Sequence, residues 1–329
     1  MEAKYKGSPI LVIANGKLAS SVTVCLLLAG HAVTLMTEDK EEAVDGVNRH
    51  FAQLSGLRGE GLPGVNGKGP MPEMLEIEGF LDRKAAGHKI GIAITGEDVD
   101  EKKARIQQLE KLLFPGSIIA INTESIPLSL LQESCEHPER LIGLNWVEPA
   151  HTTFFLEIVT NAGTKKKLVD NLYELAKAHW NKDPYCVSKD VGIRAKMLSG
   201  MIREAFFLVQ NGYATIEDID RACRNDAGYY LPFAGNFRYM DLMGTYAYGL
   251  VMKDLNRELS KEDHVPPFFE KIMEQGGLGM QNNKGFYHYE PGDAERWNEL
   301  FSMFSYQIQQ IIEKNPFNQL QKPTGNYHV

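Results

Sequence analysis

The stretch PILVIANGKLASSVTVCLLLAGHAVTLM, residues 9–36, decides the fold. It begins with an apolar run of strand length at residues 9–14 and passes through a tight Asn-Gly-Lys turn at residues 15–17. Residues 18–29 have the length and apolar content of a buried helix, and residues 31–36 form a second strand-like run. A strand, a turn, a helix and a strand within about 30 residues predict the βαβ unit that opens a doubly wound sheet.

The remaining sequence extends this sheet and then changes character. Further strands are predicted at residues 89–95, 117–122, 141–147 and 154–159, and helices at residues 39–53 and 98–113. Residues 55–72 are so rich in glycine and proline that we predict a loop or lid there. From residue 192 onward helical periodicity dominates, most clearly at residues 216–223 and 298–314.

The change from α/β to helical patterns predicts two domains. We expect a Rossmann-type domain at residues 1–186, followed by a helical domain at residues 187–329. The fold class is therefore α/β, a doubly wound sheet followed by an all-helical C-terminal domain.

Composition excludes several classes of partner. The formal net charge is -8, and the one basic run, three lysines at residues 165–167, is expected on the exposed start of a helix, so no nucleic acid is expected. No apolar stretch approaches the ~20 residues that cross a bilayer, and no signal-peptide pattern opens the chain. The scattered cysteines predict reduced thiols in a cytoplasmic protein. They are Cys25, Cys135, Cys186 and Cys223.

The turn after the first strand partly fits a dinucleotide-binding loop. Such a loop favours GxGxxG, because its glycines allow a tight turn, a close approach to pyrophosphate and helix–strand contact. Here the three positions hold Ala14, Gly16 and Ala19, so only the middle glycine is present. This motif alone leaves nucleotide binding and a purely structural turn equally open. The candidate cofactor-binding residues of the turn are Ala14, Asn15, Gly16, Lys17 and Leu18.

The end of the second strand bears on the choice of dinucleotide. An acidic residue that binds the ribose hydroxyls is expected there, and Thr37 occupies the position, followed by Glu38 and Asp39. Those carboxylates would repel an additional 2′-phosphate. The sequence therefore favours NAD over NADP.

Six blocks further along the chain carry a more specific signal. They are GSIIAINTESI at 116–126, HPERLIGLNWVEPA at 137–150, FFLEIV at 154–159, GYATIEDIDRACRN at 212–225, GNFRYMDLMG at 235–244 and LGMQNNKGFYHY at 278–289. In order and spacing, the chain from about Pro9 to Tyr289 resembles the 3-hydroxyacyl-CoA dehydrogenase family. The glycine-rich segment and the tail after Tyr289 have no counterpart in that resemblance.

The resemblance implies an N-terminal NAD domain, a helical domain used for dimerisation and an acyl-CoA site between them. It implies a homodimer and a role in fatty acid metabolism. The family oxidises a 3-hydroxyacyl-CoA reversibly to the 3-ketoacyl-CoA by hydride transfer to NAD. A histidine takes the hydroxyl proton and a glutamate orients it, because imidazole titrates near working pH.

Carried over position by position, the proton-transfer site is altered. The family's histidine falls on Asn145, which cannot take up a proton, and the asparagine three residues later falls on Glu148. The first serine of an NTSS block falls on Glu124. The orienting glutamate remains, as Glu157. The candidate catalytic positions implied by the resemblance are thus these four.

The substrate and cofactor positions are better kept. Ser125 retains the second serine of the same block, while an asparagine of the helical domain falls on Ala195. Glu97 and Lys102 match positions that contact NAD, and Asn122 keeps its place at a strand end. The resemblance implies that part of the cofactor site survives and that most of the proton-transfer site is lost.

Two functional hypotheses follow. The first is an NAD-dependent oxidoreductase acting on a 3-hydroxyacyl-CoA or a related 3-hydroxy acid. The second is a catalytically inactive family member that holds a nucleotide or an acyl-CoA. In the first, Glu148 is a candidate substitute base, because crowding by Glu124 and Glu157 would raise its pKa. In the second, Glu148 and Glu124 point into solvent.

A cation held by these glutamates and His151 is a weaker hypothesis, because their spacing matches no metal motif. No metal is expected. His151 is expected in a loop or on the surface.

Overall fold

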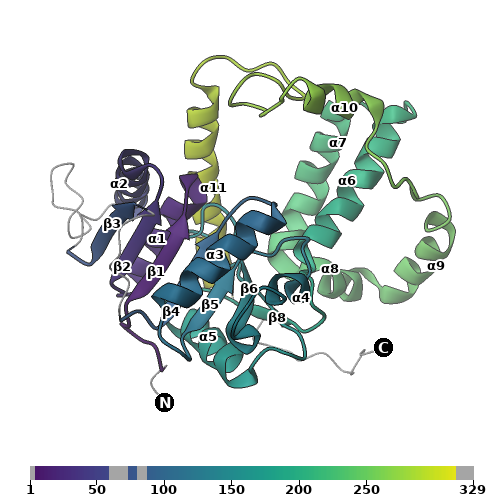
Figure 1. Cartoon of the computed structure of the whole chain (residues 1–329). Helices are drawn as coiled ribbons and strands as arrows, with labels where there is room; N and C mark the ends of the chain where they lie inside the picture. The colour runs from purple at the N-terminus through teal and green to yellow at the C-terminus, as the bar shows by residue number, and fades with distance from the viewer. Residues whose placement is uncertain (1–3, 59–72, 80–86, 316–329) are drawn as a thin grey trace. The chain divides into compact units, whose positions relative to one another are not determined.

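The computed structural model describes residues 4–58, 73–79 and 87–315. The chain divides into two compact units, Met1–Lys196 and Met197–Val329. The first unit contains the β-sheet, and the second, up to residue 315, consists of helices and connecting loops (Figure 1). The predicted fold class, a Rossmann-type sheet followed by a helical domain, is confirmed. The boundary between residues 186 and 187 stays a prediction.

An eight-stranded sheet forms the centre of the first unit, in the order β3-β2-β1-β4-β5-β6-β7-β8. All neighbours from β3 to β6 are parallel, β7 is antiparallel to β6, and β8 is parallel to β7. The strands are β1 Ile10–Ala14, β2 Val33–Thr37, β3 Leu75–Gly79, β4 Ile90–Ile94, β5 Ile118–Ile121, β6 Leu141–Asn145, β7 Glu157–Val159 and β8 Tyr185–Val187. The carboxyl ends of the parallel strands share one edge, where ligands bind in sheets of this type.

Helices cover both faces of this sheet (Figure 1). One face packs on α1 Gly16–Leu28, α2 Lys40–Arg58 and α5 Lys166–His179, and the other on α3 Val99–Leu112 and α4 Leu128–Gln132. A short 3-10 helix, η1, spans Pro138–Arg140. The sequence of β1 is apolar throughout because its alternate residues enter the hydrophobic cores on opposite faces of the sheet. Ile10, Val12 and Ala14 belong to one core, and Leu11 and Ile13 to the other.

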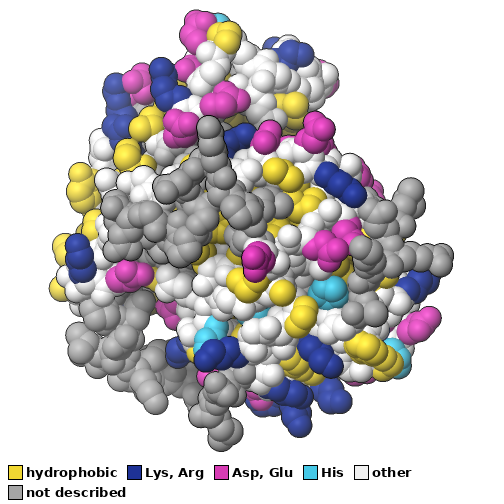
Figure 2. Space-filling view, turned by 90° about the vertical axis from the view of Figure 1, so that its left-hand side faces the viewer, with side chains coloured by type: hydrophobic (Ala, Val, Ile, Leu, Met, Phe, Trp, Pro, Cys, Tyr) yellow, Lys and Arg dark blue, Asp and Glu magenta, His cyan; other side chains and the backbone are white. Residues whose placement is uncertain are grey.

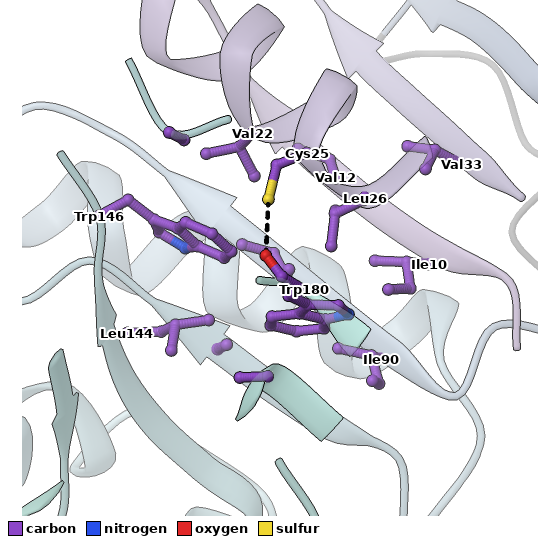
Figure 3. Close-up of a cluster of buried hydrophobic side chains, with 14 of the residues drawn as sticks. Ile10, Val12, Val22, Cys25, Leu26, Val33, Ile90, Leu144, Trp146 and Trp180 are labelled. Carbon is purple, nitrogen blue, oxygen red and sulfur yellow. Dashed lines mark hydrogen bonds between the residues drawn. The ribbon is translucent and has the colours of Figure 1, made fainter. Parts of the chain in front are cut away.

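The core on the α1 side ties the start of the chain to α5 (Figure 3). The Sγ of Cys25 in α1 lies 3.5 Å from the carbonyl oxygen of Trp180, the residue that follows α5. The Trp180 ring stacks on Trp146 at 5.7 Å between centroids, and its Nε1 donates to His31 at 2.9 Å. Burial of these aromatic side chains fixes the loop that follows β6 against α1.

The second unit contains helices throughout its described part. They are the main part of α6 Arg194–Gln210, α7 Ile216–Ala222, the π-helix η2 Cys223–Ala227, α8 Gly228–Met243, α9 Thr245–Leu255, α10 Pro267–Glu274 and α11 Asp293–Lys314. α7 begins with a capping box, in which the Thr215 hydroxyl and the Asp218 carboxylate each accept a backbone N–H. None of the helices in the described part of the chain is long and apolar enough to cross a membrane.

Most predicted elements of the first unit are present, with local differences. Residues 55–58, predicted as loop, form the last turn of α2; residues 59–72 lie outside the described residues. β3 and β8 were not predicted, since β3 alternates with glutamates and β8 has three residues. Both strands lie at sheet edges, where one exposed side weakens the apolar signal.

Candidate functional site

The turn between β1 and α1 leaves the start of the helix open to an anion. Gly16 has φ +76°, a conformation that favours glycine and explains why this glycine of the motif is present. The Asn15 side chain does not cap α1; its Oδ1 accepts from the Thr37 hydroxyl and the Glu38 N–H, both at 2.9 Å. With no acidic residue in the first turn, the N–H groups of α1 fit the pyrophosphate of a dinucleotide.

Thr37 and Glu38, at the end of β2, have different roles. Thr37 is buried and uses its hydroxyl to hold Asn15. The Glu38 side chain is 65% exposed and lies 3.4 Å from Arg105 Nη2. An exposed carboxylate there fits ribose hydroxyls. Lys17 is exposed, whereas Ala14 is buried in the core.

Asn122, Lys102 and Glu97 join the ends of β4 and β5. The Asn122 amide pairs with the backbone of Thr95, accepting at 3.0 Å and donating at 2.8 Å. Lys102 is fully buried, and its Nζ donates to the Asn122 carbonyl at 2.8 Å and approaches Glu97 Oε1 at 3.4 Å. Burial lowers the pKa of Lys102, and Glu97 opposes that shift. Glu97 is half-exposed and accepts from the Ser125 hydroxyl at 3.4 Å.

Asn145 and Glu157 face each other across β6 and β7 as cross-strand partners. Asn145 Nδ2 donates to Glu157 Oε2 at 2.8 Å and to Thr123 Oγ1 at 3.2 Å. Its Oδ1 accepts from the N–H groups of Thr123 at 2.7 Å and Glu124 at 3.2 Å. A primary amide has two donor hydrogens and two acceptor lone pairs. Asn145 is 1% exposed and uses all four within the protein.

Glu157 is buried as completely as Asn145 and is also saturated. Its Oε1 accepts from the Tyr185 hydroxyl at 2.8 Å and from the N–H groups of Ile193 at 3.0 Å and Arg194 at 3.1 Å. Burial, followed by this contact with Glu157, raises the pKa of Tyr185. The carboxylate therefore anchors the beginning of α6 in addition to holding Asn145.

Glu124 lies beside this pair and contacts a cation that the sequence did not point to. Its Oε2 is 3.1 Å from Arg194 Nη1. Burial raises the pKa of Glu124, although Arg194 opposes the shift. The next residue of α6, Ala195, is half-buried. Neither Arg194 nor Tyr185 was predicted, because both approach Glu157 from distant segments.

Glu148 belongs to a different cluster. Its Oε2 accepts from the hydroxyl of Ser21 in α1, and its Oε1 lies 3.7 Å from His50 Nε2 in α2. Burial raises the pKa of Glu148 to about 7, while Ser21 and Lys17 lower it. Burial also lowers the pKa of His50 to about 4. Between about pH 4 and about pH 7 the Glu148 carboxyl and the His50 imidazole are both uncharged. Their 3.7 Å separation is therefore not an ion pair near pH 6.

The expected cause of the raised Glu148 pKa is wrong, although its direction is right. The expectation relied on crowding by Glu124 and Glu157, whereas the shift comes from burial among α1, α2 and the β6–β7 loop. His151 stands in that loop and contacts His50 edge-on at 4.7 Å between ring centroids. With 7% exposure it is a buried loop residue, so the surface alternative is wrong.

A cation site is not formed by these residues. Within residues 4–58, 73–79 and 87–315, no group of three or more histidine, cysteine, aspartate or glutamate side chains is placed to hold a metal ion. The geometry of the described residues therefore gives no support to a cation held by the three glutamates and His151.

The loop between β6 and β7 is held by a buried lysine. Lys182 Nζ donates to the carbonyls of Ala150 and Thr153, the latter at 2.6 Å, and lies 5.4 Å from the Trp146 ring centroid. Burial lowers its pKa. On the other side of the loop, the Ala150 N–H donates to Ser21 Oγ at 3.2 Å. Sequence patterns gave no indication of this role for Lys182.

Comparison with known families identifies the whole arrangement. Residues 9–191 match the model of the 3-hydroxyacyl-CoA dehydrogenase NAD binding domain, and residues 193–289 match the C-terminal domain of the same enzymes. The chain belongs to the 3-hydroxyacyl-CoA dehydrogenase family. The cofactor of this family's N-terminal domain is NAD, in agreement with the open first turn of α1.

Curated relatives in and near this family share about a quarter of their residues with the chain. A 5-formyl-3-hydroxy-2-methylpyridine 4-carboxylate 5-dehydrogenase of Mesorhizobium japonicum is 27% identical over 230 residues, 65% of this chain and 74% of the relative. A 3-hydroxybutyryl-CoA dehydrogenase of Clostridioides difficile is 29% identical over 285 residues, 85% of this chain and 99% of the relative. The chain spans only 35% of the fatty acid oxidation complex subunit alpha of Vibrio campbellii.

Solved structures of proteins similar to this chain have the same fold. The crystal structure of a 5-formyl-3-hydroxy-2-methylpyridine 4-carboxylic acid 5-dehydrogenase, described as an NAD+ dependent dismutase, has a TM-score of 0.83 at 22% identity and covers 93% of this chain and 98% of its own. An (S)-3-hydroxybutyryl-CoA dehydrogenase from Ralstonia eutropha has a TM-score of 0.64 at 21% identity, covering 86% and 99%.

Proposed function

We propose that this protein is an NAD-dependent oxidoreductase of the 3-hydroxyacyl-CoA dehydrogenase type with an impaired proton-transfer step. It transfers a hydride between NAD and a 3-hydroxyacyl-CoA or a related 3-hydroxy acid. One observation carries the proposal: the buried amide of Asn145 is hydrogen-bonded to Glu157 at 2.8 Å and has no group left to take a substrate proton. Family membership and the named activity of the C. difficile relative support the reaction type.

The residues have distinct roles in this proposal. When bound, NAD supplies the hydride acceptor. Gly16 and the first turn of α1 hold its pyrophosphate, and Glu38 its ribose. Glu157 orients Asn145, and Ser125 and Ala195 line the substrate side. The full cofactor-binding set comprises Ala14, Asn15, Gly16, Lys17, Leu18, Thr37, Glu38, Glu97, Lys102 and Asn122.

Replacing Asn145 by histidine tests the missing base. We expect wild type to bind NADH in calorimetry, and to reduce acetoacetyl-CoA or acetoacetate, whichever it accepts, about 10²- to 10⁴-fold more slowly than Asn145→His, because a general base contributes a factor of that size. The imidazole restores a group that titrates near neutral pH. The Asn145→Gln variant is the control, because it keeps an amide and should gain nothing.

Two results would count against this proposal in different ways. An absence of heat with millimolar NADH would remove the oxidoreductase hypothesis. Wild-type turnover in the ordinary range of about 1–10³ s⁻¹ would show that the site is not impaired. NADH or acyl-CoA binding without turnover in both wild type and Asn145→His would instead support the alternative, a pseudoenzyme that only binds nucleotide or acyl-CoA.

The titration of Glu148, which lies outside the Asn145–Glu157 pair, gives a second prediction. Folding raises its pKa from 4.5 to about 7, so the folded state binds this proton more tightly. Stability is therefore lost as pH rises through that window. Relative to wild type, Glu148→Gln should gain roughly 1–2 kcal/mol between pH 5 and pH 8, a reduced figure because the side chain is 31% exposed.

Urea unfolding of both proteins at each pH measures this difference. The lowered pKa of His50 gives an opposite slope, but that slope is present in both proteins and largely cancels. Glu174→Gln, at an exposed position of α5, is the matched control. A stability difference that is independent of pH would contradict the assignment.

We further propose a homodimer in a reducing compartment, the cytoplasm. The second unit exposes large apolar side chains, among them Phe237 at 83%, Tyr246 at 81% and Tyr229 at 78%, as a subunit interface does before assembly.

All four cysteines are free, with Cys25 buried and Cys186 and Cys223 exposed. Among the side chains coloured in Figure 2, charges of both signs are interspersed.

A further inference from the structure

Arg194 contacts Glu157 through its backbone and extends its guanidinium to Glu124, whose own N–H donates to Asn145. Arg194 is the first residue of α6, and its backbone N–H donates to Glu157 Oε1 at 3.1 Å. Its side chain extends to Glu124, with Nη1 at 3.1 Å from Oε2, and its Cζ lies 5.8 Å from the Phe155 ring centroid. The ion pair and the aromatic ring together fix the position of the guanidinium.

The guanidinium retains donors for a ligand. Arginine presents five N–H groups in a planar fork that matches both oxygens of a carboxylate. Among the described residues, the ion pair with Glu124 uses Nη1 alone, and the Arg194 side chain is 36% exposed. A carboxylate that approaches from solvent can therefore bind the remaining edge of the fork.

Glu124 is held in an unusual conformation to make this contact. Its φ is +43°, in the left-handed region that non-glycine residues seldom adopt, and its N–H donates to Asn145 Oδ1 at 3.2 Å. Such strain is retained where the surrounding structure imposes it, and it is concentrated at functional sites. Burial raises the pKa of Glu124, and its ion pair with Arg194 opposes that shift.

We propose that Arg194 recognises a substrate carboxylate, so that the site takes a free 3-hydroxy acid or its 3-oxo form in preference to a CoA thioester. This inference rests on the proposed function and narrows its substrate class. A thioester carbonyl is uncharged and gives a guanidinium no ionic partner, whereas a free acid supplies a carboxylate close to the reacting carbon.

The phosphates of CoA are another source of negative charge. The long pantetheine arm places them far from the reacting carbon. The Arg194 guanidinium, in contrast, contacts Glu124, whose N–H donates to Asn145, the position of the missing base. The geometry therefore fits the carboxylate of a short acid better than a distant phosphate.

Acetoacetate binding in the presence of saturating NAD+ tests the inference, because both components are oxidised and no turnover occurs. Calorimetry should show that Arg194→Gln weakens acetoacetate binding at least about 10-fold, since a charge-assisted pair is lost. Arg194→Lys should lie between, because it keeps the charge without the fork. Glu124→Gln should bind acetoacetate more tightly, because it removes the competing charge.

Lys196→Gln is the matched control, because it removes one positive charge from an exposed position of the same helix and should change nothing. Acetoacetyl-CoA affinity should not depend on Arg194. The inference is overturned if Arg194→Gln leaves acetoacetate affinity unchanged, or weakens acetoacetyl-CoA equally. Repeating the titrations without NAD+ tests Arg194 even if cofactor binding, and with it the proposed function, fails.

Discussion

Gly192→Ala is expected to destabilise the first unit by about 3–5 kcal/mol, the range for breaking a buried, hydrogen-bonded charged group. A Cβ at this position would overlap Glu157 Oε2 and lie 3.1 Å from Asn145 Nδ2. Glu157 cannot simply move aside, because four donors hold it at 1% exposure. Its displacement would leave buried N–H and hydroxyl groups unpaired.

Urea unfolding of a second glycine-to-alanine variant in the same unit provides the comparison, because its added Cβ meets no other atom. Gly56 lies in α2, is exposed, and would place an added Cβ in open space. Gly56→Ala should therefore stabilise by about 0.5–1 kcal/mol. A loss below about 1 kcal/mol for Gly192→Ala would mean that the Asn145–Glu157 pair is more adaptable than its hydrogen bonds indicate.

Lys182→Met is expected to cost about 2–4 kcal/mol, since two loop carbonyls lose their donor at a buried position. The lysine is 5% exposed and binds the carbonyls of Ala150 and Thr153. Methionine fills a similar volume without a hydrogen bond, so the loss reports the polar contacts and not a cavity. Lys177→Met, at an exposed position of α5, should change stability by less than about 0.5 kcal/mol.

The pH dependence of the same pair of proteins provides an independent check. Burial lowers the pKa of Lys182, so the unfolded state binds its proton more tightly than the folded state. Wild-type stability should then rise with pH towards the unfolded pKa, and the advantage over Lys182→Met should widen. A gap that narrows as the solution becomes alkaline would contradict a buried, depressed amine.

The fold was largely predictable because its strongest signal is local. The run at residues 9–14 is apolar throughout because β1 is buried on both faces, and the following turn keeps a glycine where φ is +76°. β3 was missed because its sequence, LEIEG, is half-polar. Segment length also limited prediction, since the three residues of β8 carry no periodicity.

The candidate site could be predicted only for residues that belong to the motifs of the family resemblance. Asn145 and Glu157 were paired by resemblance, and they are cross-strand partners. Tyr185 and Arg194 reach Glu157 from 28 and 37 residues away, through contacts that no short motif encodes. The pKa of Glu148 is raised by burial, and its hydroxyl partner Ser21 is 127 residues distant, so no local pattern could show that cause.

The free cysteines have a practical consequence for spectroscopy. Cys186 is exposed in the first unit and Cys223 in the second, whereas Cys25 is buried. Burial and Glu110 raise the pKa of Cys135 to about 12, so its reactive thiolate is scarce at neutral pH. Maleimide dyes should consequently react first with Cys186 in the first unit and Cys223 in the second. Energy transfer between such a dye pair turns any NAD-dependent rearrangement of the two units into a measurable optical signal, without an engineered cysteine.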